Sequence, residues 1–178
     1  TELIVDFHGD SYEELLFVRP HKKKIAELIK KSIVESIESG DHSIFVSEEL
    51  RRQIEQYYGR KIENYSIVSC GIDRTRFSKV SGSPSRLPEK AKGRTLVGYL
   101  GGLQKWQNIE AIIDIADGLR KKNPNVFFVL FTNGSCESIS DRLEALGNDN
   151  YCVLNLSMDE VPVYLRQLDA GFLIRDDI

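Results

Sequence analysis

Short apolar runs alternate with segments of helical periodicity over the first part of the chain. Three such runs predict strands, at residues 3–5, 43–46 and 65–68. Between the first two runs, isoleucine and leucine recur every three or four residues from 22 to 38, which predicts an amphipathic helix. A second helix is expected between Ser47, a good N-terminal cap, and Gly59, a residue type that often ends helices.

The alternation is clearer beyond residue 93. Apolar runs predict strands at 95–100, 126–131, 151–155 and 170–174. Helices are expected at 107–122, from Ser135 to about residue 146, and from about Asp159, after a capping-box pattern of Ser157 and Glu160. Apolar strands that are each followed by an amphipathic helix predict parallel sheets covered on both faces. Right-handed crossovers then give a Rossmann-like layout, so the predicted fold class is α/β with two Rossmann-like lobes.

Residues 78–93 separate the two halves by their composition. They hold two glycines, two prolines and several charges, which favours a linker. We therefore expect one domain at 1–77 and another at 94–178. The chain starts almost directly on an apolar run and stops soon after another, so we expect both lobes to be incomplete parts of a longer protein.

Composition and charge narrow the class of protein. The chain has 178 residues, is 41% hydrophobic and carries a net charge of −3, which suits a packed core and gives no general attraction to nucleic acid. Its three cysteines, Cys70, Cys136 and Cys152, lack metal-ligand spacing and favour reduced thiols in the cytoplasm. No apolar run is long enough to span a bilayer. The lysine run Lys22–Lys24 indicates a solvated helix start. The less favoured interpretation is that it binds peripherally at the inner face of a membrane.

Ligands in open parallel sheets bind beyond the carboxyl ends of the strands. That rule selects five segments, namely 6–10, 70–77, 101–108, 132–135 and 175–178. In "GGLQKWQN" (101–108), glycines after a strand favour either a phosphate loop or a tight corner, and neither a dinucleotide fingerprint nor a P-loop pattern is present. His8 follows the first predicted strand in a short polar loop. It either contacts a substrate hydroxyl or is an exposed loop residue without a role in binding.

The remaining polar residues of these segments are less specific. Asp73 either caps a turn or contributes to a site, and Arg74 and Arg76 either neutralise phosphate or are exposed. Asp176 and Asp177 are adjacent and lack further ligands nearby, so we predict no metal site.

Three segments in order resemble one known family. They are "IFVSEELRRQIEQYYGRKIENYSIVSCGIDRTRF" (44–77), "LVGYLGGLQKWQNIEAIIDIADGLRKKNPNVFFVLFTNG" (96–134) and "DEVPVYLRQLDAGFLIRDD" (159–177). Their order is similar to that in retaining GT-B glycosyltransferases of the glycogen synthase and sucrose synthase-like superfamily. The matching positions in the first segment are Ser47, Leu50, Tyr58, Gly59, Gly71, Ile72, Asp73 and Phe77. The resemblance covers nearly the whole chain.

The resemblance implies transfer of a sugar from a nucleotide diphosphate sugar to a saccharide or lipid-linked acceptor, with retention and without a metal or other cofactor. It implies a role in polysaccharide or glycolipid biosynthesis. His8 would touch the donor sugar. Donor binding would involve Gly101 and Gly102 near the phosphates, Asn133 and Gly134 near the nucleotide, and Lys105, Gln107 and Arg175 along the same edge.

Departures from the family pattern keep an alternative open. Where the family has Arg after the first loop glycine this chain has Gly102, and where it has Lys followed by Gly this chain has Gln107 and Asn108. Those cations normally offset diphosphate charge in the transition state. The family's paired glutamates do not occur before Ile178. The alternative is a degenerate, non-catalytic GT-B subunit that binds a ligand or a partner.

Overall fold

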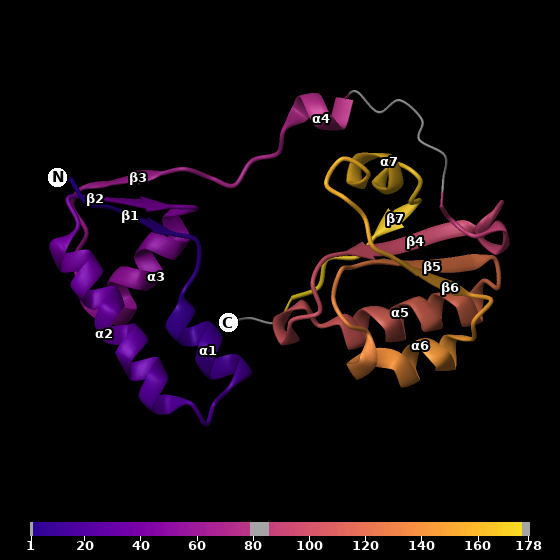
Figure 1. Ribbon diagram of the computed structural model, residues 1–178, viewed down its shortest axis with the longest axis horizontal. Helices are drawn as coiled ribbons and strands as arrows, with labels where there is room; N and C mark the ends of the chain where they lie inside the picture. Colours follow the sequence, from indigo (N-terminus) through magenta and orange to yellow (C-terminus); the bar gives the residue numbers. More distant parts are fainter. Residues whose placement is uncertain (1, 79–85, 176–178) are drawn as a thin grey trace. The chain divides into compact units, whose positions relative to one another are not determined.

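The computed structural model describes residues 2–78 and 86–175 and divides the chain into two compact units, residues 1–72 and 73–177 (Figure 1). Each unit contains a parallel sheet with helices packed on it. The predicted α/β class, with a Rossmann-like lobe in each half, is confirmed.

The first unit is built on three short strands. Its elements are β1 (Ile4–Phe7), α1 (Ser11–Val18), α2 (Lys23–Ser39), β2 (His42–Phe45), α3 (Glu48–Tyr58) and β3 (Tyr65–Ile67). The strands are parallel in the order β1-β2-β3. Phe7 and Phe45 stack with ring centroids 4.9 Å apart and pack with Ile54 and Tyr58 of α3. This cluster joins the sheet to its helices.

The helices of the first unit lie on one face of its sheet (Figure 1). Side chains alternate across the strands, so Phe7 faces the helices while Ile4, on the opposite side, is 57% exposed. For the described part of this sheet, the expectation that both faces are covered is therefore wrong.

Local signals set the ends of α3 and explain α1. The Leu50 N–H donates to Ser47 Oγ at 3.1 Å, and Gly59 ends α3 in the left-handed region with φ 62°. Both expected ends of this helix are confirmed. The pattern analysis did not predict α1, which is short and apolar on several sides; it begins because Asp10 Oδ1 accepts from the N–H groups of Tyr12 and Glu13.

The second unit has a four-stranded parallel sheet in the order β6-β5-β4-β7. Its strands are β4 (Thr95–Leu100), β5 (Val126–Phe131), β6 (Tyr151–Leu154) and β7 (Ala170–Gly171). Its α-helices are α4 (Arg74–Ser78), α5 (Ile109–Lys122), α6 (Ser140–Leu146) and α7 (Val161–Leu165). Short 3-10 turns complete it, at η1 (Glu89–Ala91), η2 (Lys105–Gln107) and η3 (Glu137–Ile139).

Strand β5 is the centre of this core. All six of its residues are buried. Phe128 and Leu130 pack toward the side of α5 and α6, whereas Phe127 and Phe131 pack toward Tyr164 of α7. Figure 1 shows the same division, with α5 and α6 on one face of the sheet and α7 on the other. The expected covering of both faces is confirmed for this sheet.

The segment expected to be a linker is described only in part, because residues 79–85 lie outside the described residues. Leu87 and Ala91 pack on the core of the second unit. Helix α4 is also tied to this unit, since Arg166 Nη2 donates to the Phe77 carbonyl at 2.8 Å. In the described residues, no helix is both long and apolar enough to cross a membrane.

Candidate functional site

The second sheet reverses its strand order next to β4. From β4 the chain adds β5 and β6 on one side and then returns to place β7 on the other. Loops that leave two neighbouring strands in opposite directions open a crevice at the carboxyl edge of a sheet, where ligands bind in open α/β folds. The loops after β4 and β7 border that point, so this edge is the candidate site.

The loop after β4 is held in place by Tyr99, a residue of that strand. Tyr99 is buried, at 1% exposed, and its hydroxyl donates to the Gly102 carbonyl at 2.7 Å. The Gly101 N–H donates to the Phe131 carbonyl of β5 at 3.0 Å. A Cβ on Gly101 would lie 2.4 Å from the Tyr99 oxygen, so only glycine fits there without a shift. The loop is therefore a tight corner that needs glycine at position 101, and the same residues are those predicted to bind phosphate.

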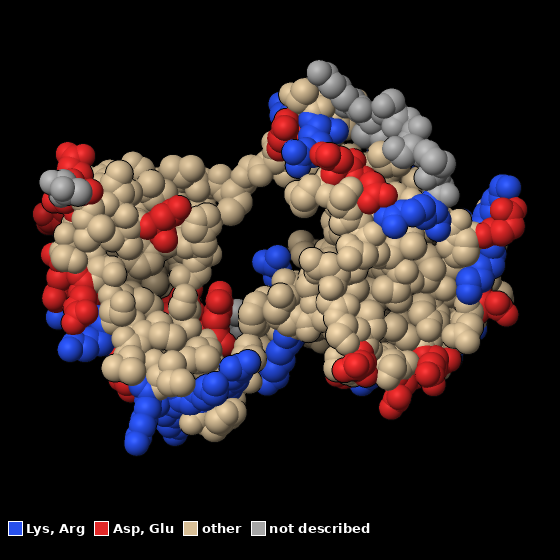
Figure 2. All heavy atoms as spheres, in the orientation of Figure 1, with Lys and Arg blue, Asp and Glu red and all other residues tan. Residues whose placement is uncertain are grey.

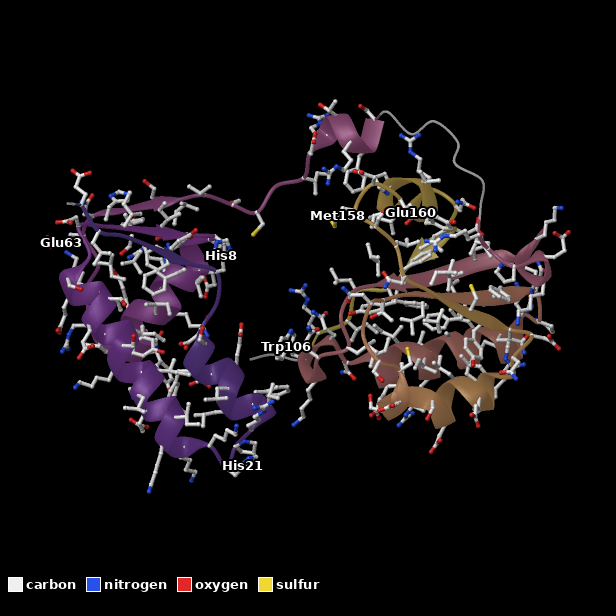
Figure 3. All side chains as sticks on the ribbon, in the orientation of Figure 1. His8, His21, Glu63, Trp106, Met158 and Glu160 are labelled. Atoms are coloured by element: carbon white, nitrogen blue, oxygen red, sulfur yellow. The ribbon has the colours of Figure 1, made fainter. Side chains whose placement is uncertain are left out.

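The rest of "GGLQKWQN" forms η2 and the start of α5. Lys105 is exposed, while Trp106 and Gln107 are half-buried (Figure 3 shows Trp106). Asn108 has φ 48°, the one non-glycine residue with positive φ in the described ranges. Asparagine tolerates this left-handed region better than most residues. Asparagine can therefore hold this position, although glycine would hold it more easily.

The loops after β4 and β5 are neighbours. A Cβ on Gly134 would lie 3.5 Å from the Leu103 side chain, and the Gly134 N–H donates to Thr132 Oγ1 at 3.2 Å. Asn133 is exposed at the tip. Beside them is a pocket of about 430 Å³, with Lys105 in its wall. Its lining residues are Leu103, Gln104, Lys105, Asn108, Ile109, Glu110, Ser138 and Ile139.

Arg175 reaches the same edge from β7. Burial raises the pKa of the Tyr99 hydroxyl, and the positive charge of Arg175 acts in the opposite direction. Arg175 itself is exposed. Thus seven of the sequence-predicted residues lie on loops at the carboxyl edge of this one sheet: Gly101, Gly102, Lys105, Gln107, Asn133, Gly134 and Arg175. Their roles stay predictions.

His8 belongs to the other unit, at the carboxyl end of β1 (Figure 3). Its Nε2 lies 3.0 Å from Asp6 Oδ2, and both side chains are more than half exposed. Asp10, two residues on, is buried and caps α1. The loop that carries His8 is therefore anchored while the imidazole is open to solvent.

The other polar candidates are structural or outside the site. Asp73 Oδ1 accepts from the Thr75 and Arg76 N–H groups and caps α4. This agrees with the interpretation of Asp73 as a cap. Arg76 pairs with Asp159 at 3.6 Å. Asp176 and Asp177 lie outside the described residues. Within the described ranges, no cluster of three histidine, cysteine or carboxylate side chains could hold a metal ion.

Sequence reasoning missed Tyr99 and Tyr58, which hold two of the loops. Tyr99 reads as one more apolar strand residue. Only Gly101 and Gly102, which follow Tyr99 and Leu100, indicate that another group approaches the backbone there. Tyr58 donates to Asp10 at 2.8 Å, across 48 positions of sequence, and no local pattern predicts such a contact.

No protein-family model and no curated protein sequence matches the chain. Solved structures do. HepE from Anabaena in complex with UDP covers 96% of this chain at 18% identity with a TM-score of 0.68. The α,α-trehalose 6-phosphate synthase of Burkholderia multivorans covers 96% at 12% identity with a TM-score of 0.67.

The chain has the fold of part of a GT-B glycosyltransferase. A third match, to the E. coli trehalose-6-phosphate structure bound with UDP-2-fluoro glucose, covers 84% of the chain at 14% identity with a TM-score of 0.59. The chain spans less than half of each of these structures, namely 46%, 45% and 42% of their lengths.

Proposed function

We propose that this chain is the donor-binding part of a glycosyltransferase. The whole protein would move a sugar from a nucleotide diphosphate sugar to a saccharide or lipid-linked acceptor, with retention, in polysaccharide or glycolipid biosynthesis. The observation that carries this proposal is the meeting of the glycine loop after β4 with the loop after β5 at the switch-point edge. Similar folds that have been solved hold UDP or a UDP-sugar analogue.

The proposed roles follow from position. Gly101 and Gly102 let the diphosphate approach the backbone, and Lys105 and Arg175 supply positive charge as the diphosphate leaves. Gln107 offers an amide at the same edge, and the loop of Asn133 and Gly134 contacts the nucleotide. His8 contacts the donor sugar. The resemblance to GT-B enzymes implies that the reaction needs no metal or cofactor.

The alternative is a degenerate subunit that binds without catalysis. It is favoured by Gly102 and Gln107, which stand where related enzymes carry cations. Such a subunit keeps a nucleotide site but lacks electrostatic stabilisation of the leaving diphosphate. Donor binding without turnover by the whole protein, given a panel of sugar acceptors, would select this alternative.

Nucleotide binding is the direct test of the donor site. We expect UDP, GDP or ADP to raise the melting temperature of the 178-residue chain, because a ligand that binds only the native state stabilises it by about 2.7 kcal/mol at a concentration of 100 Kd. Isothermal titration calorimetry then ranks the three bases. No binding of any of them in the millimolar range would reject the proposal.

A negative charge introduced into the loop after β5 tests whether UDP binds beside that loop. Gly134→Asp is sterically tolerated, since its Cβ would meet Leu103 at 3.5 Å, but it brings a carboxylate toward the proposed diphosphate. We expect about a tenfold loss of UDP affinity with an unchanged fold. The matched control is Gly118→Asp in α5, where an added Cβ meets nothing within 4 Å. Equal affinity of both variants would contradict the placement.

Peripheral binding to an anionic membrane, from the cytoplasmic side, is a second part of the proposal. Lys22–Lys24 stand at the start of α2, followed by Leu28, which is 67% exposed. Figure 2 shows basic side chains gathered at the lower end of this unit. Each lysine near such a surface contributes about 1 kcal/mol. Co-sedimentation with phosphatidylglycerol vesicles should fall for the double variant Lys23→Glu and Lys24→Glu, and no sedimentation of the wild type would reject this part.

A further inference from the structure

In the described part of the first unit, the helices leave one face of the sheet open (Figure 1), and that face carries a histidine between two polar side chains. Nδ1 of His42, in β2, is 2.8 Å from Asn64 Oδ1, and its Nε2 is 2.9 Å from Ser66 Oγ of β3. Phe45, three positions after His42, packs toward the helices. Because side chains alternate across a strand, His42 lies on the opposite face, the face of the exposed Ile4.

The hydrogen bonds of Asn64 decide which nitrogen of His42 carries the hydrogen. The Asn64 Nδ2 group donates to the Asp41 carbonyl, so Asn64 Oδ1 faces the imidazole as an acceptor. His42 is therefore protonated at Nδ1, and its Nε2 accepts from the Ser66 hydroxyl. Asp41 is held in turn, because its Oδ2 accepts from the Leu3 N–H at 2.8 Å. A hydroxyl, an imidazole and a group that orients the imidazole, in this order, make an activated serine nucleophile.

We propose that Ser66 is a nucleophile with His42 as its base, that Asn64 is the positioning residue for the imidazole, and that this face cleaves uncharged carboxylic esters. The inference goes beyond the proposed function and does not depend on donor binding. It uses a face of the first sheet, whereas the donor site uses an edge of the second.

The neighbours of Ser66 indicate the class of substrate. Register pairs Ile4 with His42. It also pairs Ile44 with Ser66, so an isoleucine borders the polar group at each of these two positions. Asp6 pairs with Ile44 from the other side, and its carboxylate is more than half exposed. Apolar neighbours favour a short acyl chain, whereas a nearby carboxylate repels a phosphate ester.

Strand β3 also offers a backbone donor for the reaction. It is an edge of the described sheet, and the Val68 N–H donates inward to the Phe45 carbonyl at 2.9 Å. Successive N–H groups of a strand point in opposite directions, so the Ile67 N–H faces away from β2. The N–H of the residue after a serine nucleophile is a donor that can stabilise the oxyanion of acyl transfer.

The proposed reaction consumes only the ester and water. Ser66 Oγ attacks the carbonyl carbon while its proton passes to Nε2 of His42. The bond from that carbon to the leaving oxygen breaks, and the imidazolium returns the proton to the leaving alcohol. Water then attacks the acyl group on Ser66 in the same way, which releases the carboxylic acid and restores the hydroxyl.

Hydrolysis of p-nitrophenyl acetate by the 178-residue chain tests the proposal. We expect an initial burst of p-nitrophenolate, and mass spectrometry of a quenched digest should find the acetyl group on Ser66. Ser66→Ala and His42→Gln should each lower the rate about a hundredfold, since a positioned base contributes about 10²–10⁴-fold. Asn64→Ala should lower it about tenfold, and Asn64→Asp should restore it, because a carboxylate also accepts from Nδ1–H and orients the imidazole.

Matched variants separate this reaction from background acetylation of other side chains. Ser69→Ala removes another exposed serine of the first unit, and His21→Gln removes an exposed histidine of the same unit. Both should react at the wild-type rate. p-Nitrophenyl phosphate should not be cleaved, and its cleavage would overturn the assigned substrate class. Circular dichroism and melting temperature show whether each variant is folded.

The tautomer can be measured without any substitution. The imidazole ¹⁵N resonances of the wild type should show His42 protonated at Nδ1, and protonation at Nε2 alone overturns the inference. Acetylation confined to lysines, or equal hydrolysis by the wild type and Ser66→Ala, overturns it as well. Binding of UDP bears only on the proposed function, so each of the two proposals can fail while the other stands.

Discussion

The Tyr58 hydroxyl donates a hydrogen bond of 2.8 Å to Oδ1 of Asp10, and so joins α3 to the loop that carries His8. The same oxygen accepts from the N–H groups of Tyr12 and Glu13 at the start of α1. Asp10 and Tyr58 are both buried, at 7% exposed each. Burial and this bond to Asp10 hold the pKa of Tyr58 well above its usual range.

Removing this carboxylate should destabilise the first unit strongly. Asp10→Ala takes away a helix cap and leaves the Tyr58 hydroxyl without its acceptor, which together cost about 2–4 kcal/mol of unfolding free energy. Tyr58→Phe removes the bond but keeps the cap, at about 1 kcal/mol. Urea denaturation of both single variants and the double variant gives the coupling energy, and strictly additive effects would contradict the contact.

The two loop glycines should respond differently to a methyl group. On Gly101 an added Cβ would lie 2.4 Å from the buried Tyr99 oxygen, whereas on Gly102 it would meet only the flexible Gln104 side chain. Gly101→Ala should therefore cost about 1–3 kcal/mol, and Gly102→Ala should be nearly neutral. Thermal melts of the two variants provide the comparison. Tyr99→Phe should relieve part of the cost in Gly101→Ala, and failure to do so would assign the strain elsewhere.

Periodicity predicted the layers because burial follows the repeat of each element. The six consecutive apolar residues of β5 predicted a strand covered on both faces, and the structure confirms this prediction. In the first unit the same rule wrongly predicted that both faces of the sheet are covered. Ile4 is apolar but 57% exposed, on the sheet face away from the helices (Figure 1). Local caps at Ser47 and Gly59 were also readable, since they act within one helical turn.

The sequence predicted which edge of the sheet holds the candidate site, but not how the side chains at that edge contact one another. The rule that ligands bind at the carboxyl ends of strands selects the loop of Gly101 and the loop of Gly134 directly. That the Tyr99 ring lies under this loop depends on side-chain packing within a formed sheet. The place of Arg175 beside β4 depends on β7 returning to pair with it, which spacing along the sequence does not specify.

Asn108 offers a test of backbone conformation at the start of α5. Its φ of 48° is costly for residues with a branched Cβ and free for glycine. We expect Asn108→Gly to change the unfolding free energy by a few tenths of a kcal/mol and Asn108→Val to lower it by about 1–2 kcal/mol. Chemical denaturation measures both. Equal stability of the two variants would show that the residue can leave the left-handed region at no cost.

The cysteines should differ in their reaction with iodoacetamide. Cys70 is exposed, whereas burial raises the pKa of Cys152 to about 11. Because the thiolate is the reactive form, Cys152 stays neutral and unreactive in the folded chain at about pH 8. Mass spectrometry of timed digests should find Cys70 modified first and Cys152 last. In urea the two should react alike, and equal rates in the folded chain would contradict the burial of Cys152.

Glu160 should make the second unit sensitive to acid. Its Oε2 accepts from the Ser157 N–H at 2.8 Å and from Ser157 Oγ at 2.9 Å, and these bonds, with Arg86 beside them, lower its pKa. A carboxylate whose pKa is lower in the folded state stabilises it above the unfolded pKa. That contribution is lost as the pH falls through the folded pKa.

Glu160→Gln should therefore lower stability near neutral pH and flatten its decline on acidification. Urea denaturation between about pH 7 and pH 3.5 measures this slope. The matched control is Glu144→Gln, an exposed glutamate of α6 whose side chain should contribute little. If Glu160→Gln and the wild type lose stability in parallel over this range, the Ser157 bonds do not favour the ionised form of Glu160 in solution.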